Sequence, residues 1–331
     1  MKLVSIWIQL VIQSSSIWLQ SLKQQDVFAD DLSRIFDEAL YRGDEQNLTQ
    51  LPSPNQLRGK VIVKTDVTKQ LSDKLAELCN ICQQIKFESF EKSASSDSCY
   101  HVTGFSEMEA KQIIEKSSTG IVEHSERQLN RVYPFGLRVQ SGNFDPIPFW
   151  NCGLQMVALN VQTGDDHLTT NLGRFRSTGN CGFVLKPKAA IRQVVQEDMQ
   201  SAPVRMSLKV RIISGQNLPK ESATGDPISP YVCVQVRGHN VDDTPIHKTE
   251  TVPNNGLNPF WDTTFRCSIK VPELALISFT VYNNNRPLAA LAVPVLDLAR
   301  GYRHVTLTTL QGIPLPVSSL FIHSSIDVYD G

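Results

Sequence analysis

The feature that most constrains the fold is a change of pattern near residue 200. From Ser207 onward the chain contains only short segments in which apolar and polar residues alternate. We expect eight strands there, which start near Ser207, Tyr231, His247, Thr263, Ala275, Leu288, His304 and Ser319. This alternation and regular spacing are typical of a β-sandwich. The sequence therefore predicts an all-β domain over residues 200–331.

Before residue 187 the predicted strands and helices alternate. Apolar residues recur at helical spacing over residues 24–41, and Ser106 is placed to cap a helix over residues 107–117. Strands are predicted at residues 60–64, 100–105, 131–133 and in a segment that ends at residue 160. Such alternation is typical of an α/β fold with parallel strands. Residues 67–99 are polar and rich in serine, so we expect a linker that holds one short helix over residues 71–81.

Composition limits the classes of function. The chain has 32 basic and 33 acidic residues and a net charge of -1, which argues against a polybasic nucleic-acid-binding protein, so no nucleic acid is expected as a partner. An odd number of cysteines, 7, argues against a complete disulfide framework and favours a reducing compartment. Residues 1–20 are an atypical N-terminus, because their apolar run is interrupted by Ser5 and Gln9. Both a membrane span and a secretory signal are weak interpretations of it.

The search for chemical motifs gives few candidates. Cys79 and Cys82 form one CxxC pair inside a predicted helix, which is a weak signal for redox or zinc chemistry. Lys64 ends one predicted strand, and Arg131 and Tyr133 lie on another. In a parallel barrel the carboxyl ends of the strands meet at one face, where two cations suit a phosphate and a tyrosine suits a ring. Spacing alone leaves open the alternative that these residues are ordinary surface charges.

The most distinctive residues lie between Asn130 and Pro187. The segments NRVYPFGLRVQSGNFDPIPFWNCGLQMVALNVQT and GRFRSTGNCGFVLKP closely resemble the Y half of eukaryotic phosphoinositide-specific phospholipase C. The segment LPSPNQLRGKVIVK resembles the stretch just before the linker between the two catalytic halves. The final region resembles the C2 domain of that family, most similar to the delta class, in the segments LKVRIISGQNLP, NNGLNPFWD and GYRHVTL. The resemblance extends from about Ser21 to the C-terminus.

The resemblance implies a fold and an activity. The family has a distorted TIM barrel, interrupted by a linker, and hydrolyses phosphatidylinositol 4,5-bisphosphate to inositol trisphosphate and diacylglycerol in signalling. Two histidines and a Ca²⁺ held by Asn, Asp and Glu perform the reaction, and all of these groups come from the first half of the barrel. Nothing in this sequence matches them. We therefore expect an α/β incomplete TIM barrel over residues 21–187 (the end of the X half, the linker and the Y half), then an all-β C2 sandwich, and no catalytic residues.

The resemblance also assigns substrate-binding residues one by one. Lys64 matches a family lysine that contacts an inositol phosphate, Arg131 matches the arginine that grips a phosphate, and Tyr133 matches the tyrosine that packs on the inositol ring. Two positions depart from the family. The second basic position is Asp66, which would repel a phosphate, and a serine position is Gly104. An apolar ridge that dips into the bilayer in the family is matched by Phe135 and Leu137.

The C2 region departs from a calcium-binding pattern. Ca²⁺ prefers charged carboxylate oxygens, yet the first-loop aspartate position is Ser229 and the third loop is rich in asparagine. The weak candidates that remain are Asp226, Asn254, Asn283 and Asn285. We expect weak or no Ca²⁺ binding by this domain, so Ca²⁺ is a cofactor of the family only by resemblance.

Three interpretations of function remain open. The chain is a fragment of a phospholipase C that is inactive alone, a non-catalytic C2 protein that binds membranes or partners, or an incomplete sequence or splice form of an ordinary enzyme. The expected partners are a phosphoinositide membrane surface and a complementary barrel half or regulatory protein. The expected location is cytoplasmic and peripheral to the membrane. We also expect residues 21–186 to be poorly stable without a partner half, and residues 200–331 to fold alone.

Overall fold

The computed structural model describes residues 6–8, 21–43, 49–66, 70–96, 98–136, 141–221 and 225–329. The chain forms two compact units, one of residues 1–135 with 152–158 and one of residues 136–151 with 159–331, and each is described by itself. The prediction for the N-terminus lies outside the described residues except for the short strand β1 (Ile6–Ile8). Leu137 also lies outside them.

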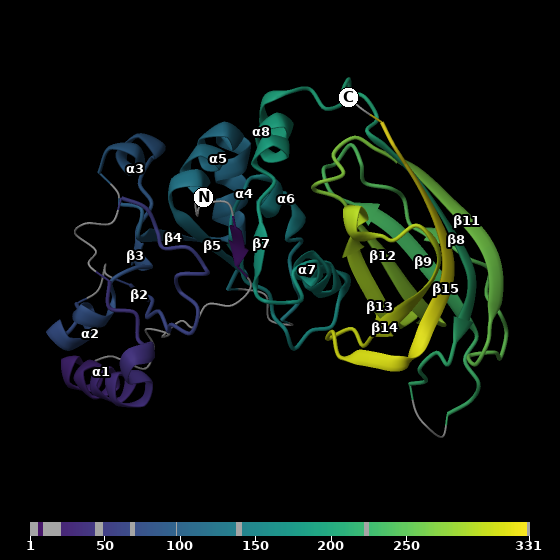
Figure 1. Ribbon diagram of the computed structural model, residues 1–331, viewed down its shortest axis with the longest axis horizontal. Helices are drawn as coiled ribbons and strands as arrows, with labels where there is room; N and C mark the ends of the chain where they lie inside the picture. Colours follow the sequence, from purple (N-terminus) through teal and green to yellow (C-terminus); the bar gives the residue numbers. More distant parts are fainter. Residues whose placement is uncertain are drawn as a thin grey trace. The chain divides into compact units, whose positions relative to one another are not determined.

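The first unit is built on a parallel sheet of five strands in the order β2-β3-β4-β5-β6. These strands are β2 (Thr65–Asp66), β3 (Gln83–Ile85), β4 (His101–Ser106), β5 (Leu129–Tyr133) and β6 (Met156–Val157). The helical segments are α1 (Leu22–Phe36), η1 (Asp37–Ala39), α2 (Asp73–Leu78), α3 (Phe90–Ser96), α4 (Glu107–Lys116) and α5 (Ser118–Arg127) (Figure 1). The predicted parallel α/β architecture of a partial barrel is confirmed.

Local chemistry explains where helices begin. Ser106 accepts a hydrogen bond from the backbone N–H of Glu109 at 3.3 Å, and the Glu109 carboxylate accepts one from the Ser106 N–H at 2.8 Å. This capping box satisfies donors that the first turn of α4 leaves without helical partners. The predicted helix over residues 107–117 and its cap are confirmed.

Two segments of the first unit differ from the sequence expectations. Within residues 60–64, Val61 forms an isolated parallel bridge with Leu40, and the named strand β2 begins only at Thr65. Residues 67–99, expected as a linker, contain α2, β3 and α3. The expectation of a linker was based on the polar composition of the segment and overlooked Leu75 and Leu78. Both side chains are buried in a small core with residues of α1. Burial of each leucine contributes roughly 1.5–3 kcal/mol, which stabilises α2 against α1.

The second unit contains a β-sandwich. Its antiparallel strands follow the order β10-β9-β12-β13-β14-β15-β8-β11, and β13 and β14 share a single residue pair, Ala290 with Thr308. The sheet therefore divides into two four-stranded layers (Figure 1). The strands are β8 (Met206–Gln216), β9 (Pro230–Arg237), β10 (His247–Lys248), β11 (Phe260–Ile269), β12 (Leu276–Asn283), β13 (Arg286–Pro294), β14 (Gly301–Thr308) and β15 (Pro314–Val328), with η3 (Val295–Asp297) between β13 and β14. The predicted eight strands are confirmed.

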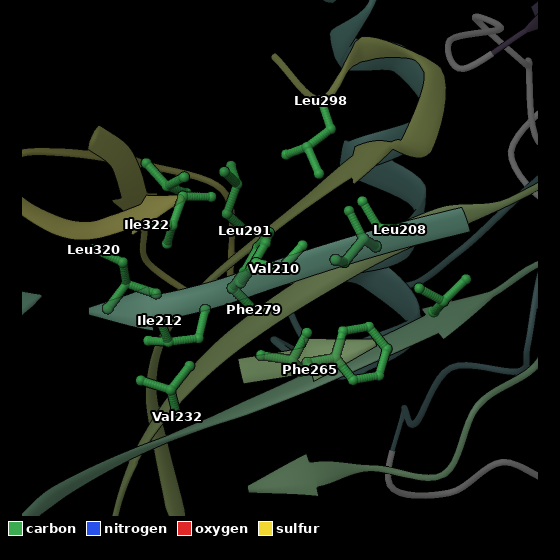
Figure 2. Packing of buried hydrophobic residues seen from close by; sticks show 14 of the residues in the cluster. Leu208, Val210, Ile212, Val232, Phe265, Phe279, Leu291, Leu298, Leu320 and Ile322 are labelled. Carbon is green, nitrogen blue, oxygen red and sulfur yellow. The ribbon is translucent and has the colours of Figure 1, made fainter. Parts of the chain in front are cut away.

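The sandwich core follows from the alternation in the strands. In β8, Leu208, Val210 and Ile212 are buried while Lys209 between them is exposed. Figure 2 shows these side chains meeting apolar residues of the other layer, among them Phe279 and Leu291. Burial of such side chains contributes roughly 1.5–3 kcal/mol each, so this core is the main source of stability in the second unit.

The second unit also includes α6 (Ile147–Asn151), α7 (Asp166–Arg176), β7 (Phe183–Leu185) and α8 (Lys188–Gln196). A Cβ atom at Gly173 of α7 would lie 2.6 Å from the Cβ of Ala292, so the helix approaches β13 closely. Arg174 is 2 % exposed and donates to the carbonyl of Leu274 at 2.7 Å. Burial lowers the pKa of Arg174 to about 9. The boundary expected between residues 187 and 200 thus lies inside a compact unit, and the domain limits stay a prediction.

Candidate functional site

The strand register brings the predicted binding residues to one face of the parallel sheet. Asp66 pairs with Gln84, Gly104 pairs with Arg131, and Ser106 pairs with Tyr133. Because side chains alternate along a strand, residues in register or two positions apart share a face. We call this surface the Lys64–Arg131 face, and its members are Lys64, Asp66, Gln84, Gly104, Arg131, Tyr133 and Ser106, whose hydroxyl donates to the Glu109 carboxylate at 2.8 Å.

Lys64 is the most unusual residue of this face. Its side chain is almost completely buried, with 1 % exposed, and its Nζ donates a hydrogen bond to Oε1 of Gln84 at 2.5 Å. Burial, with repulsion from Arg131, lowers the pKa of Lys64 from its ordinary value of 10.5 to about 8. Cys82 and Asp66 oppose this effect, since each raises the pKa. A lysine held in this way costs stability and is typical of functional sites.

Arg131 and Tyr133 lie two residues apart on β5 and are half-buried. The guanidinium carbon of Arg131 lies 5.4 Å from the centre of the Tyr133 ring, which is within cation–π range. Burial lowers the pKa of Arg131, and burial followed by the charge of Glu109 raises the pKa of Tyr133. The structure therefore brings together the three residues that the sequence assigned to substrate binding.

Gln84 belongs to this face but was missed by sequence reasoning. A Cβ at Gly104 would lie 3.7 Å from both Cδ and Nε2 of Gln84, so the amide reaches toward the position where the glycine leaves no side chain. Gln84 could have been found from the alternation of side chains along the strands, because it pairs with Asp66 and therefore lies on the same face of the sheet. This alternation was not recognised because residues 67–99 were interpreted as a linker without strands.

Of the two residues expected to form an apolar ridge, the structure describes only Phe135. Phe135 lies two residues beyond the end of β5, is 41 % exposed, and its backbone N–H donates to the carboxylate of Glu107 at 3.3 Å. Leu137 is outside the described residues. The membrane role of both stays a prediction.

The thiols of the CxxC pair are shielded from solvent, whereas those of a redox site would be accessible. Cys79 and Cys82 are both buried thiols, and Cys79 donates to the carbonyl of Leu75 at 3.0 Å. Burial raises the pKa of Cys82 to about 11, which opposes formation of the reactive thiolate.

The C2 loops fit Ca²⁺ poorly. Asn283 accepts through its side-chain oxygen from the N–H of Ser229 at 3.0 Å, and Asn254 donates its N–H to the Ser229 hydroxyl at 3.0 Å. Asn285 accepts from the hydroxyl of Tyr231 at 3.0 Å. The side-chain oxygens of Asn283, Ser229 and Asn285 are neutral and already accept hydrogen bonds, whereas Ca²⁺ prefers several carboxylates; Asn254 takes part only through its backbone N–H. Asp226 is exposed, and among the described residues no group of three or more His, Cys, Asp or Glu side chains could hold a metal ion.

In the part of the chain that the structure describes, no helix combines the length and apolar character needed to cross a membrane.

Comparisons with known proteins cover most of the chain. Residues 18–67 match the X domain and residues 75–189 match the Y domain of phosphatidylinositol-specific phospholipase C, and residues 206–303 match the C2 domain. The X-domain match is short, and the Y-domain match includes β3, β4 and β5. The matches therefore include Lys64, Arg131 and Tyr133.

The similar proteins include a phosphodiesterase and inactive phospholipase C-like proteins by name. The chain is 33% identical to inactive phospholipase C-like protein 2 of Mus musculus, over 92% of this chain and 32% of the relative. It is 32% identical to 1-phosphatidylinositol 4,5-bisphosphate phosphodiesterase delta-3-A of Danio rerio, over 92% of this chain and 46% of the relative. The chain thus spans about a third to a half of the length of these curated relatives.

The fold is also similar to a solved structure of the same family. The crystal structure of L. pealei PLC21 superposes with a TM-score of 0.84 and 27% sequence identity, over 94% of this chain and 44% of that one. The profile matches, the relatives and this structure agree with the parallel sheet and the sandwich described above. The chain belongs to the phosphoinositide-specific phospholipase C family, of which it holds part of the X domain, the Y domain and a C2 domain.

Proposed function

We propose that the Lys64–Arg131 face binds the phosphorylated inositol headgroup of a phosphoinositide, and that the chain acts at membrane surfaces as the carboxyl-terminal part of a phospholipase C. One observation carries this proposal. Lys64 and Arg131 lie on one side of the parallel sheet, where Lys64 donates to Gln84 and Arg131 is in register with Gly104, and repulsion from Arg131 adds to burial in lowering the pKa of Lys64. A phosphate between them would relieve this repulsion and gain charge-assisted hydrogen bonds.

The geometry supports recognition of both parts of a headgroup. The two cations suit the phosphate oxygens, and the Tyr133 ring beside Arg131 offers a flat apolar surface for the inositol ring. Figure 1 places β4 and β5 side by side at the centre of the first unit, with α4 and α5 beside them. A rigid parallel sheet is a suitable scaffold, because ligand groups on strands are held more precisely than on loops.

The reaction proposed for the family is hydrolysis of phosphatidylinositol 4,5-bisphosphate to inositol trisphosphate and diacylglycerol. By the resemblance, the catalytic histidines and Ca²⁺ ligands of that reaction belong to the first half of the barrel, and we propose that this sequence holds no counterpart of them. We therefore assign binding and orientation of the headgroup to this polypeptide, and we assign the bond-breaking groups to a complementary barrel half. The names of the two relatives, one a phosphodiesterase and one an inactive protein, are consistent with a fold that serves either role.

The C2 sandwich and Phe135 support a peripheral location on a cytoplasmic membrane surface. A C2 domain is present by profile match, and Phe135 exposes an aromatic ring next to the strand that carries Arg131. An aromatic side chain at that place would anchor the face in the headgroup layer. Because the C2 loops fit Ca²⁺ poorly, we propose that this docking does not require the ion.

The test is co-sedimentation with phosphatidylcholine vesicles that contain a phosphoinositide. Arg131→Gln and Lys64→Met should each weaken binding about tenfold, since each removes a charge-assisted contact of about 1.5 kcal/mol. Arg127→Gln removes an exposed arginine of α5 and is the matched control. Binding that is equal for all four proteins would refute the headgroup site.

A second assay addresses catalysis. Purified protein is incubated with radiolabelled phosphatidylinositol 4,5-bisphosphate, and release of soluble inositol trisphosphate is measured with and without Ca²⁺. We expect no release above background. Release that depends on Arg131 would show that the polypeptide is catalytically complete.

A further inference from the structure

The net positive charge of the Lys64–Arg131 face is smaller than the charge of its two cations alone. Asp66 lies on β2 in register with Gln84, two residues after Lys64, and its charge raises the pKa of Lys64. The carboxylate is therefore close enough to act on the same groups that would hold a phosphate. Lys64, Arg131 and Asp66 together bring one net positive charge to the face.

The neutral groups of the face also limit how many phosphate groups it can bind. Gly104 pairs with Arg131 and supplies no side chain, so this position of β4 offers no hydroxyl donor. The nearby amide of Gln84 uses its oxygen to accept from Lys64. Its Nε2 is the donor that reaches toward Gly104, at 3.7 Å from the position of the missing Cβ. Besides the Tyr133 hydroxyl, which lies beside the proposed ring surface, the face offers one amide donor and two cations, and these suit one phosphate group.

A ring phosphate carries a charge of about -1.5 to -2 near neutral pH. A single phosphate between Lys64 and Arg131 would approximately neutralise the two cations. A second phosphate on the neighbouring ring carbon would double the negative charge, whereas the face offers no further cation among the residues that the structure describes and carries the Asp66 carboxylate beside Lys64. Like charges in a partly buried site are costly because the local dielectric is low.

We propose that the Lys64–Arg131 face selects an inositol headgroup with one ring phosphate over one with two adjacent ring phosphates, and that Asp66 is the residue that determines this selectivity. This inference rests on the proposed function, because it assumes that the face binds an inositol headgroup at all. It assigns to Asp66 the role of excluding a ligand rather than of contacting one.

The experiment compares the two lipids at equal total ring-phosphate charge, and the affinity is expressed per mole of phosphoinositide. Vesicles of phosphatidylcholine are doped either with phosphatidylinositol 4-phosphate or with phosphatidylinositol 4,5-bisphosphate at half the amount, and binding of the full 331-residue chain is measured by co-sedimentation. Competition by free inositol 1,4-bisphosphate and inositol 1,4,5-trisphosphate separates headgroup recognition from attraction to a charged membrane. The parent chain should bind the monophosphate lipid more tightly, and its free headgroup should compete better.

Two variants of Asp66 test the cause. Asp66→Lys should change the affinity ratio in favour of the bisphosphate by about tenfold, equivalent to about 1.4 kcal/mol. Asp66→Asn should change it in the same direction by a smaller factor, and it keeps the size of the side chain. Glu77→Lys, which changes an exposed glutamate of α2 by the same charge, should leave the ratio unchanged. Circular dichroism of each variant verifies that the sheet is intact.

The outcomes separate the two proposals. If Arg131→Gln reduces binding of both lipids but neither Asp66 variant changes their ratio, the selectivity inference is wrong and the headgroup site stands. If Glu77→Lys changes the ratio as much as Asp66→Lys, the effect is one of net charge and the inference also fails. If Arg131→Gln changes nothing, both proposals are refuted.

Discussion

The buried charge of Lys64 leads to a prediction about stability as a function of pH. Lys64 is 1 % exposed, and burial with repulsion from Arg131 lowers its pKa from 10.5 to about 8. Replacement by methionine keeps a long unbranched side chain and removes the charge. The comparison of the parent protein with Lys64→Met therefore isolates what the buried ammonium costs the folded state.

The magnitude follows from the two pKa values. A fall of about 2.5 in pKa corresponds to about 3 kcal/mol, at 1.36 kcal/mol for each unit. Below pH 8 the lysine is charged in both the folded and the unfolded chain, so the full cost of burial is present. Between pH 8 and 10.5 the unfolded chain holds the proton more firmly than the folded chain, so the folded protein gains stability as the pH rises. Above pH 10.5 the cost disappears.

The assay is urea unfolding followed by circular dichroism at a series of pH values, for the parent and for Lys64→Met. The free energy of unfolding of the parent, relative to the variant, should increase by about 3 kcal/mol from below pH 8 to above pH 10.5. Groups shared by the two proteins cancel in this difference. Lys60→Met, which removes an exposed lysine four residues earlier, is the matched control. A difference that stays constant with pH, or that decreases, would refute the burial argument.

Two further predictions concern the second unit. Gly173→Ala should destabilise it by about 1–3 kcal/mol in urea unfolding, because the new Cβ would lie 2.6 Å from Ala292, whereas Gly136→Ala has no atom within 4 Å and should be close to neutral; equal effects would contradict the close approach of α7 to β13. In the C2 loops, isothermal titration of the parent should detect no micromolar Ca²⁺ affinity, while Ser229→Asp combined with Asn283→Asp should lower the melting temperature without Ca²⁺ and recover it when Ca²⁺ is added. Tight Ca²⁺ binding by the parent would show that neutral oxygens suffice there.

Periodicity was sufficient to predict an element wherever the pattern is complete within the element itself. The eight strands of the sandwich follow from alternation such as that of β8, whose buried and exposed residues can be seen in the printed sequence. The helix α4 follows from the capping pair Ser106 and Glu109, because both partners lie within one turn. The alternation can be seen within each strand, and the capping pair lies within one turn, so the sequence alone indicates these elements even though β8 pairs with the distant strands β11 and β15.

Short elements held by distant residues were not predictable in the same way. The segment expected as a linker contains β3, three residues long, which is a strand because β2 and β4 pair with it on either side. The segment that resembles the family barrel includes α7, yet Gly173 and Arg174 place this helix in the compact unit of the sandwich. Neither contact partner is close in sequence.

The same distinction applies to the candidate site. The sequence by itself determined the fold class, the family resemblance and the identity of Lys64, Arg131 and Tyr133 as candidates. Only the tertiary structure decided that Lys64 is buried, that Gln84 accepts its hydrogen bond, and that Arg131 lies near enough to lower its pKa. The physical reason is one of distance along the chain. Which face of a strand a side chain occupies follows from its position in that strand, whereas the register between parallel strands is set by backbone hydrogen bonds and helix packing between residues tens of positions apart. The charge on this face is consequently a property of the folded sheet.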